Sequence, residues 1–164
     1  SSTAENMINN FKETVKIYEQ GKAYYDALKS VHDLVKGARK VQQTILLVGD
    51  ISDIYVTNFN TMMGDPNFTV EELSAIAFGY NRMLEESSNL LLDLKEVTTA
   101  TGLSMTDKER LDIINRIYGE VLEYKNLTWY YTRKNIGISY LRSKKKGDSQ
   151  RVLALYGTHE QRYW

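Results

Sequence analysis

The sequence has 164 residues, with 21 basic and 21 acidic side chains, one proline and no cysteine. A chain of this size buries roughly 70% of the surface that its unfolded form exposes, which is enough for one domain with a core. Zero net charge is unlike the basic excess of a dedicated nucleic-acid-binding protein, and the lack of cysteine excludes disulfides, zinc thiolate sites and a thiol nucleophile. The longest apolar run, Val152 to Tyr156, is too short to cross a bilayer. We expect one soluble, mostly helical domain over 1–164.

The first predicted element is a long amphipathic helix over about residues 5–48. From Phe11 to Val48 its apolar positions step by threes and fours, apart from gaps at Gly21 and His32, with charged residues at many positions between them. Gly49-Asp50-Ile51-Ser52-Asp53 then predicts a break, in which Ser52 or Asp50 caps a short helix over about 52–63.

The clearest turn in the chain is Gly64-Asp65-Pro66-Asn67, since a helix-ending glycine is followed by a proline. Two T-x-x-E capping boxes follow, beginning at Thr69 and Thr106. They predict long helices over about 69–99 and 106–146.

The last long helix carries two apolar stripes. The first has the heptad spacing of a bundle or coiled-coil seam, at Ile114, Ile117, Val121, Tyr124, Thr128, Tyr131, Asn135 and Ile138. The second contains Leu122, Trp129 and Leu141, with Tyr118 and Tyr130 beside it. We therefore expect this helix to pack against neighbours on two sides.

Four basic residues, Arg142, Lys144, Lys145 and Lys146, come together before Gly147. Cations in the last turn of a helix interact favourably with the negative end of its dipole, and a glycine commonly follows as part of the C-cap. This favours a solvated helix end, after which a short helix over about 149–156 folds back. The alternative is a phosphate-binding patch.

No catalytic, metal or cofactor site is predicted. A carboxylate-bridged di-iron bundle needs Glu-x-x-His pairs, yet the residues three before His32 and His159 are Lys29 and Tyr156. The chain has no G-x-S-x-G, G-x-x-x-x-G-K-[ST] or G-x-G-x-x-G motif. We expect a protein that is not an enzyme.

Three consecutive aromatic residues, Trp129-Tyr130-Tyr131, would suit base stacking if they were exposed. Because adjacent helical residues cannot share a face, one or two should lie in the core, Trp129 among them, and one should point outward. Aromatic side chains dominate the energetics of protein interfaces. Trp129, Tyr130 and the C-terminal pair Tyr163-Trp164 are therefore candidate contacts.

Several stretches resemble the TraI-type transfer protein of Bacteroidetes conjugative transposons, which shares only its name with an unrelated relaxase. They are YYDALKSVHDLVKGARKVQQTILLVGDISDIYVTNF (24–59), EELSAIAFGY (71–80), LSMTDKERLDII (103–114) and YYTRKNIGISYLRSKKKGDSQRVLALYG (130–157).

This resemblance implies an exported component of a conjugative type IV secretion apparatus, similar to TrbJ-like and minor-pilin proteins, with its signal peptide removed. It implies an all-α fold with an elongated three-helix body and a smaller helical appendage. We expect Ile51 to Phe68, as the short portion bounded by turns, to form or link the appendage. The expected location is periplasmic or at the cell surface, and the expected partners are other transfer proteins.

Two other functions stay open. One is a nucleic-acid-binding accessory factor that uses the basic end of the last long helix together with Arg133 and Lys134. The other is a cytoplasmic helical adaptor or chaperone.

Overall fold

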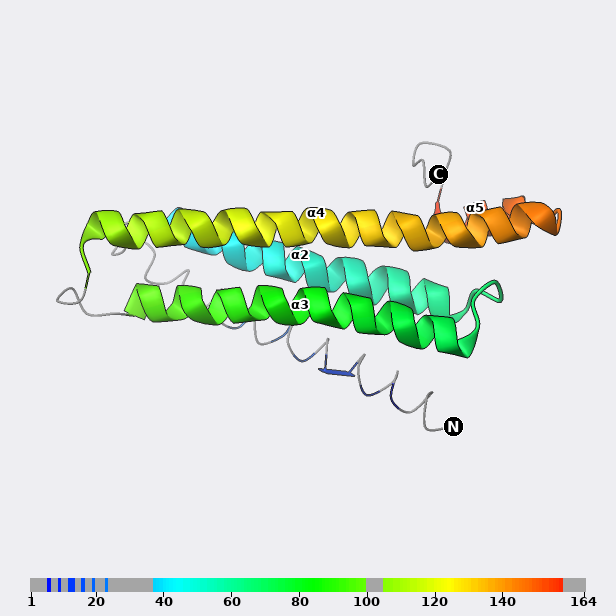
Figure 1. Cartoon of the computed structure of the whole chain (residues 1–164), viewed down its shortest axis with the longest axis horizontal. Coiled ribbons are helices and arrows are strands. Elements are labelled where there is room, and N and C mark those ends of the chain that lie inside the picture. The colour runs from blue at the N-terminus through cyan, green and yellow to red at the C-terminus, as the bar shows by residue number, and fades with distance from the viewer. Residues whose placement is uncertain are drawn as a thin grey trace.

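The computed structural model describes residues 37–99 and 105–157, together with Asn6, Asn9, Lys12, Glu13, Lys16, Glu19 and Ala23. Within the two long ranges the chain forms helices and no strand: α2 (Ala38–Met63), α3 (Val70–Thr99), α4 (Asp107–Lys145) and α5 (Ser149–Tyr156). Helices α2, α3 and α4 lie side by side along one long axis, and each runs antiparallel to the one before it in the chain (Figure 1). The short α5 turns back beside the end of α4. The predicted all-α class, with a three-helix body and a smaller helix, is confirmed.

Both predicted capping boxes are formed, and α3, α4 and α5 begin and end within about a residue of their predicted bounds. The Thr106 hydroxyl accepts from the Glu109 N–H at 3.1 Å, and the Glu109 carboxylate accepts from the Thr106 N–H at 2.9 Å. Thr69 and Glu72 make the same exchange at the start of α3, with both distances 3.1 Å. These starts were predictable because each cap needs only residues within one turn.

The predicted break after Gly49 is wrong, because α2 continues through it to Met63. Ser52 is not an N-cap: it is buried inside the helix, and its hydroxyl donates to the Val48 carbonyl at 3.2 Å. Ile51, beside it, is fully buried. Burial of this apolar face stabilises the helix more than one glycine weakens it.

The helix begins instead after Gly37, whose φ of 83° lies in the left-handed region that favours glycine. The predicted helix over 5–48 is therefore not continuous through this position. A Cβ atom at Gly37 would lie 2.9 Å from Cδ2 of Leu111, so α4 also approaches closely here. Most of the predicted helix before Gly37 lies outside the described residues.

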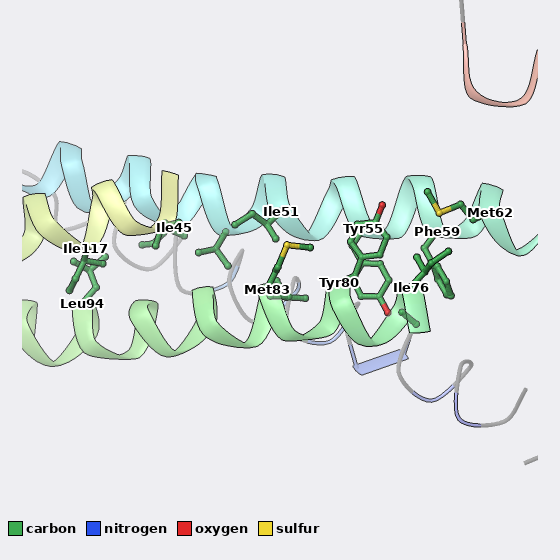
Figure 2. Close-up of a cluster of buried hydrophobic side chains, with 14 of the residues drawn as sticks. Ile45, Ile51, Tyr55, Phe59, Met62, Ile76, Tyr80, Met83, Leu94 and Ile117 are labelled. Atoms are coloured by element: carbon green, nitrogen blue, oxygen red, sulfur yellow. The ribbon is translucent and has the colours of Figure 1, made fainter. Parts of the chain in front are cut away.

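The segment from Ile51 to Phe68 is not an appendage, contrary to the prediction. Ile51, Tyr55, Phe59 and Met62 are fully buried and form the side of α2 that faces the other helices (Figure 2). The small peripheral helix is α5. The turns predicted on both sides of this short segment suggested an appendage. The sequence alone does not show which face of the segment the other helices cover.

Aromatic rings of α2, α3 and α4 pack together in the part of the core nearer the α2–α3 turn. Tyr55 and Tyr80 stack with centroids 4.7 Å apart, and Phe59 meets Tyr55 edge to face at 5.6 Å. Tyr131 of α4 meets Tyr80 edge to face at 4.9 Å, while the Tyr80 hydroxyl lies 2.5 Å from Oγ1 of Thr132. Such aromatic pairs contribute about 0.5–1.5 kcal/mol each beyond their buried area.

The predicted seam of α4 is confirmed, since its members are buried or pack partly against the core. The seam changes character along the helix. The first part of the buried face is apolar, at Ile114, Ile117 and Val121, whereas its second part, seam and flanking positions together, also buries small polar side chains at Thr128, Thr132, Asn135, Ser139 and Ser143.

Candidate functional site

The basic end of α4 finishes in a glycine C-cap, as predicted. Gly147 has a φ of 70°. Its N–H donates to the Lys144 carbonyl at 3.2 Å, and the Asp148 N–H donates to the Ser143 carbonyl at 2.8 Å. This pair of bonds is the Schellman motif, which satisfies the last carbonyls of the helix and reverses the chain toward α5.

Two of the four basic side chains also bind the turn between α2 and α3. Arg142 donates through Nη1 to the Asn67 carbonyl at 2.8 Å, and its Nη2 lies 2.7 Å from Oε2 of Glu72. Lys146 donates to Oδ1 of Asn67 at 3.2 Å. The hydrogen bond from Arg142, followed by that from the Thr69 backbone, lowers the pKa of Glu72 to about 2.

Beneath these cations the turn buries a carboxylate. Asp65 is almost fully buried, and it accepts from the Asn67 N–H at 2.9 Å, from the Ser139 hydroxyl at 2.5 Å and from the Tyr156 hydroxyl at 2.8 Å. Asn67 also donates through Nδ2 to the Ser139 carbonyl at 3.2 Å. The buried carboxylate is thus compensated by hydrogen bonds from three parts of the chain.

We call Asp65, Asn67, Ser139, Arg142, Lys146 and Tyr156 the turn lock. Tyr156 is its contact with α5, so the lock fixes the short helix as well as the α2–α3 turn. Burial, and then the neighbouring Asp65 carboxylate, raise the pKa of the Tyr156 hydroxyl because both disfavour the phenolate. The interpretation of the cluster as only a solvated helix end is therefore incomplete: Arg142 and Lys146 also bind the turn.

The remaining cations share the exposed side of α4 but do not form one row. Lys144 and Lys145 are exposed, as are Arg133 and Lys134 earlier in α4. At about 100° per residue, positions eleven apart coincide on a helix, so Arg133 lies in line with Lys144 and Lys134 in line with Lys145. The two rows are about 100° apart, and within each row the two cations are about 16 Å apart along the helix at 1.5 Å per residue. This distribution gives little support to a continuous phosphate-binding stripe.

Of the three consecutive aromatic residues, Tyr131 faces α3 and the other two are exposed. The Tyr131 hydroxyl donates to the Ile76 carbonyl at 3.0 Å, and burial raises its pKa. Trp129 is 36% exposed and Tyr130 is 59% exposed. The predicted core position of Trp129 is thus wrong. Helix α4 does pack against two neighbours, α2 and α3, as expected, but in the second stripe only Tyr118 and Leu122 are half-buried, while Leu141 is exposed like Trp129 and Tyr130. The candidate residues Tyr163 and Trp164 lie outside the described residues.

A groove that the sequence did not reveal lies between α3 and α4. Its volume is about 480 Å³, and it is lined by Glu86, Leu90, Glu120, Glu123, Tyr124 and Leu127. Leu127 is 48% exposed at its edge. The signal that could have found this groove is the 3-4 spacing of Glu120, Glu123 and Leu127, which lies one step away from the buried seam.

Among the described residues, no group of three or more His, Asp or Glu side chains is arranged to hold a metal ion.

In the part of the chain that the structure describes, no helix combines the length and the apolar character that a membrane span requires.

Fold and surface together define a helical bundle that carries a polar lock at one end and an acidic groove on one side. Comparisons with known protein families, with curated proteins and with solved structures find no match.

Proposed function

We propose that this chain is a non-enzymatic structural or assembly component of a conjugative type IV secretion apparatus and acts through protein contacts. The observation that carries the proposal is the resemblance of the stretches in 24–59, 71–80, 103–114 and 130–157 to TraI-type transfer proteins of conjugative transposons. The long helical bundle supports it, since such a body offers extended helix faces to other subunits. A periplasmic or cell-surface location belongs to the same proposal.

The exposed side chain of Trp129 is the best candidate anchor for a transfer partner, because large aromatic side chains at a surface supply much of the energy of protein interfaces. Affinity purification of the tagged full-length protein from envelope extracts of cells that carry the whole transfer region tests the proposal. We expect other transfer proteins to be recovered, and to be depleted by Trp129→Ala.

Leu92→Ala is the matched control, since Leu92 is also exposed but lies on α3. Recovery of no transfer protein with the unaltered chain would overturn the proposed function. Cell fractionation tests the location separately, and a chain found entirely in the cytoplasm would favour the adaptor.

Nucleic-acid binding is the weaker candidate, because Arg142 and Lys146 are engaged with the α2–α3 turn. Phosphate contacts make affinity fall steeply with salt, so titrations with single- and double-stranded DNA at low and high salt distinguish the two functions. Replacing Lys144 and Lys145 with Gln leaves the turn lock intact. We expect DNA transfer to be unchanged in this variant.

A further inference from the structure

Besides the two stripes predicted above, another row of side chains with coiled-coil spacing runs along the outside of α4. It contains Arg116, Glu120, Glu123, Leu127, Tyr130, Lys134 and Leu141, which follow one another at steps of four and three, with one step of seven. We call it the outer stripe. All its members are exposed except Glu120, which is half-buried beside Arg116, with their charged groups 3.1 Å apart. Spacing of this kind keeps a row of side chains along one line of contact with another helix.

Charge and apolarity are ordered along the outer stripe. Its first half is acidic at Glu120 and Glu123, and Glu86 of α3 adds a further carboxylate across the groove. Its centre is apolar at Leu127 and Tyr130, which are 48% and 59% exposed. Its second half carries Lys134 and then Leu141. From Glu120 to Lys134 the stripe therefore reads acidic, apolar, basic, and it is flanked by Arg116, which is paired with Glu120, and by Leu141.

The central part of this order, from Glu123 to Lys134, is complementary to its own reverse. In an antiparallel pair of α4 helices centred between Leu127 and Tyr130, Leu127 faces the partner's Tyr130 and Glu123 faces the partner's Lys134. Because the contact is two-fold symmetric, each of these pairs occurs twice. A parallel pair would instead place glutamate against glutamate and lysine against lysine, which is unfavourable.

We propose that the outer stripe is a self-association surface through which two copies of this chain form an antiparallel dimer. The occupant is a second copy because one face holds both halves of the charge complement and a shared apolar centre. A basic helix from a different protein would match only the acidic half and would leave Lys134 opposite no acidic partner. This inference goes beyond the proposed function and does not depend on it.

Sedimentation equilibrium of the full chain tests the dimer. We expect concentration-dependent dimerisation, and we expect Glu123→Lys or Lys134→Glu alone to raise the dimer dissociation constant about tenfold or more, since each puts like charges together twice. The double variant E123K/K134E exchanges the charges and should recover the wild-type constant. Glu85→Lys, an exposed change of the same kind on α3, is the matched control and should have no effect.

Cross-linking tests the register, and the absence of native cysteine makes it clean. In the proposed dimer, Glu123 of the two copies lie about 16 Å apart along the helices at 1.5 Å per residue, too far for a disulfide. We expect a mixture of the E123C and K134C proteins to form cross-linked heterodimers, while neither protein alone cross-links efficiently.

Three results would overturn the proposal. The first is a chain that stays monomeric at all concentrations, including one that binds a basic helical peptide as a monomer. The second is a dimer that Glu123→Lys weakens no more than Glu85→Lys does. The third is cross-linking of E123C to itself. Circular dichroism melts of every variant are the control for folding. We expect the fold to be retained, since all the substitutions are at exposed positions.

Discussion

In the first part of α4, Ile117 belongs with Ile45 of α2 and Leu94 of α3 to one buried apolar cluster (Figure 2). Where α4 ends, the turn lock joins the α2–α3 turn to α4 and α5 through a buried carboxylate, the Asn67 amide and two hydroxyl groups. The apolar residues are buried, whereas the turn lock buries Asp65, Asn67 and Ser139 but leaves Arg142 partly exposed and Lys146 exposed. The interactions at the two ends also differ in kind. Apolar contacts gain free energy from the area removed from water and have no preferred direction. Hydrogen bonds contribute less on balance but require particular partners.

The comparison indicates a division of roles between the two ends. Each buried residue at the apolar end should contribute more to the free energy of unfolding than each residue of the turn lock. The polar end should determine where the α2–α3 turn and α5 sit, because Asp65 is satisfied only when the Ser139 and Tyr156 hydroxyls both reach it. The small polar residues of α4 can be buried at this end because several also bond within their own helix, as Thr132 does to the Thr128 carbonyl at 2.8 Å.

The largest expected effect is at the apolar end. Ile117→Ala should lower the free energy of unfolding by about 2–5 kcal/mol, because it removes fully buried methyl groups and leaves a cavity. Urea denaturation followed by circular dichroism measures it. Leu92→Ala, at an exposed position, should change it by less than about 0.5 kcal/mol. Equal effects of the two substitutions would contradict the apolar core contact.

At the polar end, Asp65→Asn should lower the free energy of unfolding by about 1.5–3 kcal/mol, the usual range for hydrogen bonds to a charged group. The substitution keeps the shape of the side chain but replaces one carboxylate oxygen with a donor. Amide hydrogen exchange should show α5 losing protection beyond the global change. In Ile117→Ala, α5 should lose protection only in step with the rest of the bundle. Identical exchange patterns in the two variants would remove the distinction between the ends.

Between the two ends, Gly79 allows α3 and α4 to approach closely. A Cβ atom there would lie 2.2 Å from the Tyr131 hydroxyl oxygen, so Gly79→Ala should lower stability by about 1–3 kcal/mol through overpacking. Gly119 is the matched helical control, because a Cβ atom there meets nothing within 4 Å. Gly119→Ala should raise stability by about 0.5–1 kcal/mol. Thermal melts of both variants test whether they shift in opposite directions.

Alkaline pH should weaken the polar end through Tyr156. The pKa of its hydroxyl is raised in the folded protein, so its contribution to stability is fully present below the unfolded value near 10 and is lost as the pH rises above it. Tyr156→Phe should reduce the slope of unfolding free energy against pH in this range. Part of the slope should remain, because burial also raises the pKa of Tyr80. Parallel curves for the variant and the wild type would contradict the contact with Asp65.

Acid should have the smallest effect, through Glu72. Its folded pKa of about 2 lies below the unfolded value near 4.3, so the stability it adds is present above pH 4.3 and is lost as the pH falls toward 2. Solvent and salt screen this exposed pair. Glu72→Gln should flatten the acid limb of the stability profile slightly, and added salt should reduce the difference from the wild type.

The sequence predicted the parts of the fold that depend on near neighbours. Thr69 and Thr106 marked helix starts, Gly147 marked a helix end, and the spacing from Ile114 to Ile138 marked the buried face of α4. It failed where a distant contact decided the outcome. Gly49 resembled a break but lies inside α2, and Trp129 resembled a core residue but is exposed.

The sequence by itself determined that this protein is built of helices, and approximately where α3, α4 and α5 begin and end, because caps and periodicity act within one or two turns. Only the tertiary structure decided which glycine interrupts the chain, which basic side chains bind the α2–α3 turn, and which stripe of α4 is left outside. Those outcomes depend on pairs such as Asn67 with Ser139, which are 72 residues apart. A local pattern cannot encode such a pair, since either residue is equally compatible with exposure until the helices pack.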